Sequence, residues 1–161
     1  MSNSNLIDNL KVDIEISPEL QSLINRSGEL APTAIKLGLR KVTREGSKKS
    51  KENVRSLGLV RSGQLAKSIR GSTTNSKSYI GTKLWYAHFL EGGTKPHIIK
   101  PGKRRGKKFL FIFGRFVKSV NHPGIKAYKY LEDTFDDMQT SGEVNSLFAQ
   151  GVQEAIARFS K

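Results

Sequence analysis

Cysteine is absent from the 161-residue chain, and long apolar runs are absent too. Without thiols the chain cannot form disulfides, iron–sulfur clusters, thiolate zinc sites or a cysteine nucleophile. No apolar run approaches the roughly 18 residues that a membrane-spanning helix needs. The polar start, Met1–Asn5, is unlike a secretory signal. We therefore expect a soluble protein that is made and used without export and has no membrane partner.

Acidic residues are scarce in the middle of the chain. The whole sequence carries 28 Lys and Arg against 14 Asp and Glu, a net charge of +14. Residues 36–131 hold 24 of these cations and only three acids, whereas acids outnumber cations in 1–35 and in 132–161. No acid lies between Gly92 and Leu131. Two kinds of partner fit this distribution: a polyanion such as DNA or RNA, or neighbouring copies whose acidic ends meet basic middles.

The first third of the chain predicts one strand and two helices within a single domain, 1–161. Alternating apolar residues at Val12–Ile16 are typical of a half-buried strand. Ser17 and Pro18 resemble a helix cap and first turn. A longer helix is predicted from Pro32, and its apolar pattern fades in the basic segment 46–56, which we expect to be flexible.

The remainder predicts short strands and then helices. Strands are expected at 79–82, 98–99, 109–113 and 116–120, the last two forming a hairpin that turns at Gly114-Arg115. Helices are expected at 127–138 and after a capping box formed by Thr140 and Glu143. The order lacks regular βαβ alternation and predicts an α+β fold. We expect a curved, mostly antiparallel sheet of about four to five strands packed against the long helix, with C-terminal helices closing the core.

No catalytic constellation is evident in the sequence. His88, His97 and His122, with Glu91, could in principle hold a metal ion, but no two of the histidines have the i, i+4 spacing of helical zinc motifs. The alternative is that each histidine hydrogen-bonds a loop. No serine lies in a G-x-S-x-G elbow. We expect no enzyme, cofactor or metal.

The segment 100–108 is strongly basic and is expected to be flexible, because so many like charges cannot be buried. Its cations are Lys100, Lys103, Arg104, Arg105, Lys107 and Lys108. Either it is a solvated loop, or it contacts DNA or a protein partner. Phe109, Phe111 and Phe113 follow with alternate spacing, which could form a stacking platform for bases. Because Leu110 and Ile112 are apolar too, the interpretation we favour is a buried core strand.

Five short motifs follow one another in the middle of the chain. They are Arg61–Ile69, Ile80–Thr82, Tyr86–Thr94, His97–Pro101 and Val120–Ile125. Their order and spacing resemble the neck and tail-completion proteins of long-tailed bacteriophages, a family that includes head–tail joining, minor tail and virion morphogenesis proteins. The positions that match the family pattern are Ser62, Gly63, Leu65, Gly81, Thr82, Tyr86, Glu91, Gly93, Thr94, His122, Pro123 and Gly124. The chain departs from the pattern at the last helix, where it has Tyr128-Lys129-Tyr130-Leu131 in place of the family's usual Pro-Phe-Leu.

The resemblance implies a structural virion protein rather than an enzyme. It implies a subunit of a ring, hexameric, that joins or completes the tail at the DNA-filled head. Its partners would be further copies, the head–tail connector and the tail-tube protein, with non-specific contact to genomic DNA in the channel. It would reside in the virion neck or the top of the tail after assembly in the host cytoplasm. The alternatives are a basic nucleic-acid-binding protein and a small nuclease-type enzyme.

The motif residues themselves predict scaffold roles. Gly63 is expected to open a short helix, and Gly81 to let its strand approach another backbone closely. Glu91 is expected to bond loop amides or to pair with Arg61 or Arg70. His122–Gly124 is expected to form a turn in which the glycine takes positive φ.

Overall fold

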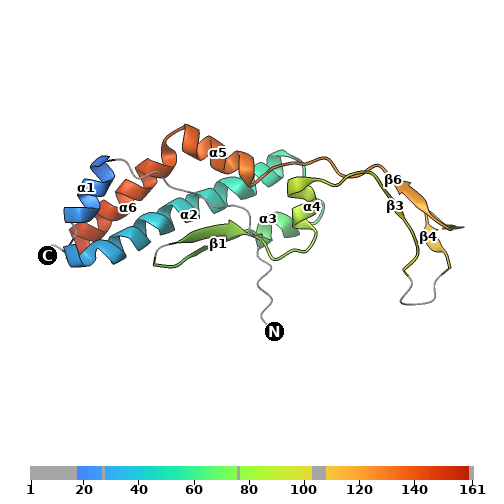
Figure 1. Cartoon of the computed structure of the whole chain (residues 1–161), viewed down its shortest axis with the longest axis horizontal. Helices are drawn as coiled ribbons and strands as arrows, with labels where there is room; N and C mark the ends of the chain where they lie inside the picture. Colours follow the sequence, from blue (N-terminus) through green and yellow to red (C-terminus); the bar gives the residue numbers. More distant parts are fainter. Residues whose placement is uncertain (1–17, 27, 76, 103–107, 160–161) are drawn as a thin grey trace. The chain divides into compact units, whose positions relative to one another are not determined.

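The computed structural model describes residues 18–26, 28–75, 77–102 and 108–159 (Figure 1). It confirms the α+β class, with helices and short antiparallel strands. The chain divides into two compact units. Unit 1 contains the described residues up to Ala87 and from Lys129 onward, and unit 2 is His88–Tyr128. The strand predicted at Val12–Ile16 lies outside the described residues.

Unit 1 is built on one long helix. Its elements are α1 (Pro18–Arg26), a 3-10 turn η1 (Gly28–Leu30), α2 (Ala31–Ser56), α3 (Gln64–Ser68), β1 (Arg70–Thr73), β2 (Ser78–Gly81), α5 (Glu132–Thr140) and α6 (Glu143–Phe159). The helix α2 is 26 residues long, so the long helix predicted from the sequence is confirmed. The C-terminal helix α6 packs along α2 (Figure 1).

Glycines bring α2 and α6 into very close contact. A Cβ atom placed on Gly151 of α6 would lie 2.5 Å from the Cα of Gly38 in α2. One placed on Gly38 would lie 2.8 Å from the ring of Phe148. The surrounding core is apolar and consists of Ile24, Ala34, Leu39, Val42, Met138, Val144, Phe148, Val152 and Ala155. The interface therefore combines backbone contact with a continuous hydrophobic core.

The segment 46–56 is helical, which corrects the prediction that it is flexible. It forms the C-terminal part of α2, and Gly46, Ser47, Ser50 and Val54 are buried there. These residues are small, so they contribute little to an apolar pattern, yet they leave room for the side chains of Ile80, Phe135 and Met138 beside Gly46. The lysines between them lie on the other side of the helix, where Lys49 pairs with Glu143.

The strands form three separate antiparallel pairs among the described residues, β1–β2, β3–β6 and β4–β5. This differs from the single sheet of four to five strands that the sequence predicts. In unit 1 the β1–β2 pair lies against α2, with Gly71 opposite Ile80. The other two pairs belong to unit 2. Each strand has only three or four residues, which is too short to support a broad curved sheet.

The C-terminal helices begin later than the sequence predicts. Lys129 has φ of 47°, a left-handed conformation that an α-helix cannot contain, so α5 starts at Glu132 rather than at 127. Thr140 is the last residue of α5, and Gly142, with φ of 71°, separates it from α6, so the predicted capping box does not form. The predicted inward face of α5 is confirmed by the burial of Thr134, Phe135 and Met138.

Unit 2 consists of short strands after a one-turn helix. The elements are α4 (Ala87–Gly92, which starts in unit 1), β3 (His97–Ile99), β4 (Leu110–Ile112), β5 (Arg115–Val117) and β6 (Val120–His122). The predicted hairpin forms between β4 and β5, but its turn is Phe113-Gly114. Both turn residues have positive φ, 47° and 78°, as a two-residue type I′ turn requires. Val120 pairs with β3 instead of extending the hairpin.

No helix in the described parts of the chain combines the length and the apolar character needed to cross a bilayer.

The contact between α2 and α6 gives the first testable prediction. The methyl group in Gly151→Ala would meet the backbone of Gly38, which cannot move without separating the helices. We expect the free energy of unfolding to fall by about 1–3 kcal/mol, although alanine is the better helix former by about 1 kcal/mol. Urea denaturation of both proteins measures the loss. Gln153→Ala, on the exposed side of the same helix, is the matched control, and equal losses in the two variants would contradict the prediction.

Candidate functional site

The motif residues of unit 1 meet at a small polar junction. The hydroxyl groups of Ser68 and Thr82 lie 2.6 Å apart, and the backbone N–H of Leu84 donates to Thr82 Oγ1 at 3.1 Å. Thr82 is buried, so these bonds satisfy a hydroxyl that water cannot reach. Two motifs that are separate in the sequence, that of α3 and that of β2, are therefore joined here by side-chain hydrogen bonding. Sequence reasoning did not single out Ser68.

The start of α3 agrees with the predicted role of Gly63. Gly63 has φ of 68° and occupies the N-cap position, a left-handed conformation that glycine adopts at low cost. The backbone N–H of Gln64 lies 3.5 Å from Ser62 Oγ. Leu65 is buried. These residues fix the beginning of a short helix and carry no reactive group into a pocket.

The prediction that Gly81 lets its strand approach another backbone closely is wrong. The close approach occurs at Gly71 of the neighbouring strand β1. A Cβ atom on Gly81 would meet nothing within 4 Å. One on Gly71 would lie 2.3 Å from Thr43 Cγ2 and 3.2 Å from the carbonyl oxygen of Thr43 in α2. Gly71 lies in a Ser- and Thr-rich stretch of the sequence, which is typical of a loop, so no local signal identified it.

The motif residues of unit 2 also form a junction. Thr94 and Ile125 exchange backbone hydrogen bonds of 2.8 and 3.1 Å, and Thr94 Oγ1 accepts a further bond from the N–H of Ile125. Gly124 has φ of 90°, and a Cβ there would lie 2.2 Å from the carbonyl oxygen of Thr94. The N–H of Gly124 donates to His122 Nδ1 at 3.1 Å. Gly124 thus has the positive φ that the sequence predicts, and glycine is required there by both conformation and space.

Gly93 is a second glycine that this junction requires. It has φ of 69°, and a Cβ would lie 2.7 Å from the backbone of Ile125 and of Ala127. Tyr86 is half-buried and packs edge-to-face with Trp85. Glu91 is half-buried in α4, and its pairing with Arg61 or Arg70 stays a prediction.

The histidines contact loops and one another. The rings of His97 and His122 lie 5.0 Å apart between register partners of β3 and β6, and His97 Nδ1 lies 2.9 Å from the carbonyl oxygen of Lys95. The ring of His88 packs on Phe89. Across the described ranges, no group of three or more His, Asp and Glu residues could hold a metal ion.

The phenylalanines of the hairpin are exposed, which overturns the interpretation of a buried strand. Phe109, Phe111, Phe113 and Phe116 are 46%, 65%, 100% and 74% exposed. Alternation places Phe109 and Phe111 on one face of the ribbon, and Phe116 is the register partner of Phe111. Leu110, Ile112 and Val117, on the opposite face, are half-buried. Both faces are apolar, but the fold covers only one. We call these four residues the phenylalanine face.

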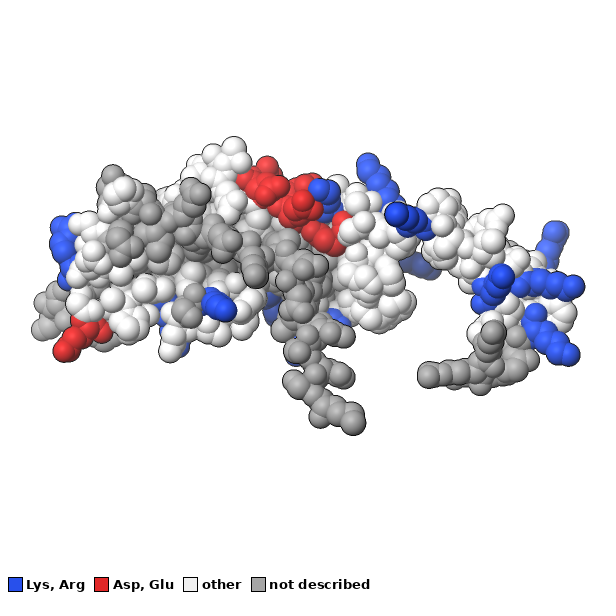
Figure 2. All heavy atoms as spheres, viewed as in Figure 1, with Lys and Arg blue, Asp and Glu red and all other residues white. Residues whose placement is uncertain are grey.

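Cations are frequent on the hairpin that carries the phenylalanine face. Unit 2 contains ten Lys and Arg residues and one acid, Glu91. Lys100, Lys108, Arg115 and Lys118 are exposed, and Figure 2 shows Lys and Arg side chains over the part of unit 2 that carries β4 in Figure 1. Lys103, Arg104, Arg105 and Lys107 of the predicted DNA or partner loop lie outside the described residues. Among the described residues of unit 2, the hairpin therefore combines positive charge with exposed apolar area.

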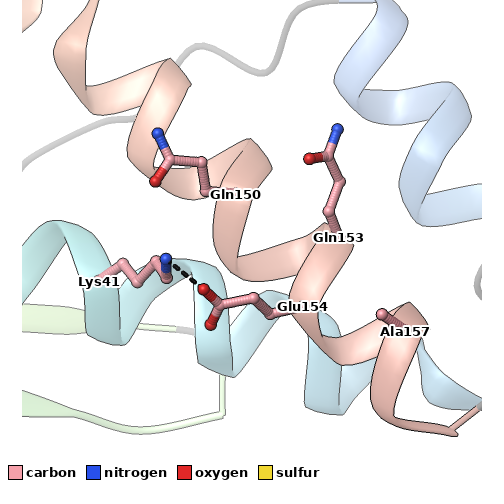
Figure 3. A pocket seen from close by; sticks show the side chains of 5 residues that line it. All are labelled: Lys41, Gln150, Gln153, Glu154 and Ala157. Atoms are coloured by element: carbon pink, nitrogen blue, oxygen red, sulfur yellow. Dashed lines mark ion pairs between the residues drawn. The ribbon is translucent and has the colours of Figure 1, made fainter.

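A shallow pocket on unit 1 contains a structural ion pair. It is lined by Lys41, Gln150, Gln153, Glu154 and Ala157 (Figure 3). Lys41 Nζ lies 2.5 Å from Glu154 Oε1 and links α2 to α6. The hydrogen bond from Lys41 lowers the pKa of the Glu154 carboxyl, so the pair contributes stability above the ordinary carboxyl pKa and loses it as the pH falls through the lowered value. None of the five side chains is arranged as a nucleophile with its base.

No family model matches the chain, and neither a curated protein nor a solved structure matches it.

Because Gly71 and Gly81 have different surroundings, the same substitution at each position gives a matched test of how closely β1 packs on α2. Gly71→Ala would force the methyl group into Thr43 and separate β1 from α2. We expect its unfolding free energy to fall by about 1–3 kcal/mol. Gly81→Ala meets no atom and should change stability by less than about 0.5 kcal/mol. Thermal melts of the two variants, compared with the unsubstituted protein, check both values, and a larger loss in Gly81→Ala would refute this account.

Proposed function

We propose that the protein is a structural subunit of the neck or tail of a long-tailed bacteriophage, where it joins or completes the tail at the DNA-filled head. The observation that carries the proposal is the pairing of the family-like motifs. Thr82 bonds Ser68, and Thr94 bonds the backbone at Ile125. The residues that resemble the family therefore form contacts that support the fold, which favours a structural role.

The proposed assembly is a hexameric ring in the virion neck or at the top of the tail, assembled in the host cytoplasm. A closed ring needs two different surfaces on each subunit. The acid-poor unit 2 and the acidic helix α5 of unit 1 supply surfaces of opposite charge. In the ring, the head–tail connector and the tail-tube protein would bind the two sides. Cations that face the channel would contact passing DNA through its phosphates, without reading the bases.

A nucleic-acid-binding protein is the second candidate, and the exposure of the phenylalanine face favours it. Exposed rings beside cations are the components of a stacking platform for single strands. Binding of that kind weakens steeply with salt, because each phosphate contact releases counterions. The ring subunit, in contrast, would act through protein contacts and would be required for joining heads to tails.

Removing the protein from a phage that encodes it separates the two candidates. We expect DNA-filled heads and separate or abnormal tails to accumulate, because packaging precedes the step that fails. Electron microscopy of lysates and a count of infectious particles measure this. Expression of the unsubstituted protein in trans should restore normal particles and serves as the control. Infectious particles in normal numbers from the deletion would exclude the proposed function.

A further inference from the structure

The phenylalanine face is an apolar surface that none of the residues described in the structure buries. Phe113 is fully exposed at the turn, and Ile98 of the neighbouring strand β3 is 58% exposed. Each phenylalanine can bury roughly 150–250 Å² in a contact, so the face approaches the size at which a monomer's surface patch is usually functional. The four rings have no donor or acceptor, and they therefore gain most against another apolar surface.

The cations beside this face define the charge of that partner. Lys108, Arg115 and Lys118 are exposed around the hairpin, and unit 2 has a single acid. A complementary surface must combine exposed apolar side chains with carboxylates. A purely apolar partner would leave the cations without counter-charges, and a neutral polar partner would not cover the rings.

Unit 1 of the same protein has such a surface. Asn53, near the end of α2, donates to the carbonyl oxygen of Tyr130 at 3.1 Å and lies 3.3 Å from Thr134 Oγ1. These bonds hold the first turn of α5 to the end of α2. Leu57 and Val60, which follow α2, are exposed. Exposed carboxylates cover α5, and Figure 2 shows them gathered there. We call this surface the acidic end; it consists of Leu57, Val60, Asp133, Asp136 and Asp137, and Glu132 beside them is paired with Lys129.

We infer that the phenylalanine face of one copy binds the acidic end of a second copy. This rests on the proposed ring and names its two surfaces. The apolar residues Leu57 and Val60 would cover the rings, and the carboxylates of α5 would face Lys118 beside the rings and the cations Lys108 and Arg115 elsewhere on the hairpin. Because the two surfaces differ, each copy binds one neighbour through each, and the chain of contacts closes into a ring or continues as a filament.

A nucleic-acid strand fits the same face less well. The rings of Phe111 and Phe116 lie 5.1 Å apart and tilted by 51°, so they contact each other and leave no slot for a base between them. Phe113 and Ile98 offer apolar area that no phosphate needs. Binding of nucleic acid instead of a second copy is therefore an outcome that the experiment must distinguish.

Two variants, each with one damaged surface, test the inference. The hairpin variant carries Phe111→Ser and Phe116→Ser, and the acidic variant carries Asp133→Lys and Asp136→Lys. All four side chains are exposed, so both proteins should fold. We expect each variant alone to be monomeric where the unsubstituted protein self-associates, with association weakened about tenfold or more. An equimolar mixture should give a one-to-one dimer and nothing larger, because each variant retains the surface that the other lacks.

Sedimentation velocity of the full chain, at one salt concentration, measures the association state of the hairpin variant, the acidic variant and their equimolar mixture. Tyr79→Ser and Glu29→Lys, an exposed aromatic and an exposed acid elsewhere on unit 1, are the matched controls and should associate like the unsubstituted protein. A melting temperature for each variant checks folding. Recovery of the dimer on mixing would itself show that the intact surface of each variant is native.

Four results would overturn the inference. The first three are an unsubstituted protein that stays monomeric, an acidic variant that still self-associates, and a mixture that yields no dimer. The fourth is that both variants assemble normally while the hairpin variant alone no longer binds a single-stranded oligonucleotide. The test separates this inference from the proposed function. If both variants restore infectious particles to the deletion, the function stands without this contact. If the mixture dimerises but the deletion leaves infectivity unchanged, the contact stands without the function.

Discussion

The close approach of neighbouring elements to α2 is the constraint on which the rest of unit 1 depends. At Gly38 the helix meets Gly151 of α6, at Gly46 it receives Ile80 of β2, and at Thr43 it receives Gly71 of β1. Each contact requires a missing side chain, and together they fix α6 and the β1–β2 pair on one helix. The Ser68–Thr82 junction follows from this, because it joins α3 to the end of a strand that α2 has already positioned.

The sequence predicts the helices of this fold better than its sheets. The inner faces of α2 and α5 follow from helical spacing of apolar residues, as the burial of Val42, Phe135 and Met138 shows. The segment 46–56 was missed because its buried positions are glycine and serine, which periodicity does not register as core. The extent of a sheet depends on which strands meet. The β4–β5 hairpin is predicted from the sequence, but nothing local in β3 indicates that it pairs with β6.

The hairpin shows why a site is harder to predict than an element. The hairpin follows from the sequence, but its turn is Phe113-Gly114 rather than the predicted Gly114-Arg115, and both turn residues have positive φ. Which face is covered does not follow, because Leu110 and Phe111 are equally apolar and only the surrounding chain decides. The glycines pose the same difficulty: Gly71 and Gly81 look alike in sequence, yet only Gly71 has a backbone and side chain against it.

The separation of charge between the two units also bears on the direction of association. Two hairpins that approach each other bring together like charges from Lys108, Arg115 and Lys118, and two acidic ends bring together the carboxylates of α5. Both symmetric pairings are therefore disfavoured, whereas hairpin against acidic end is attractive. The apolar rings supply contact area in every pairing that involves a hairpin, so charge selects the partner and the phenylalanines strengthen the contact. Salt screens interactions between exposed charges over a Debye length of about 10 Å at 0.1 M. Raising the ionic strength should therefore weaken the preference for pairing the hairpin with the acidic end before the apolar contact itself is lost.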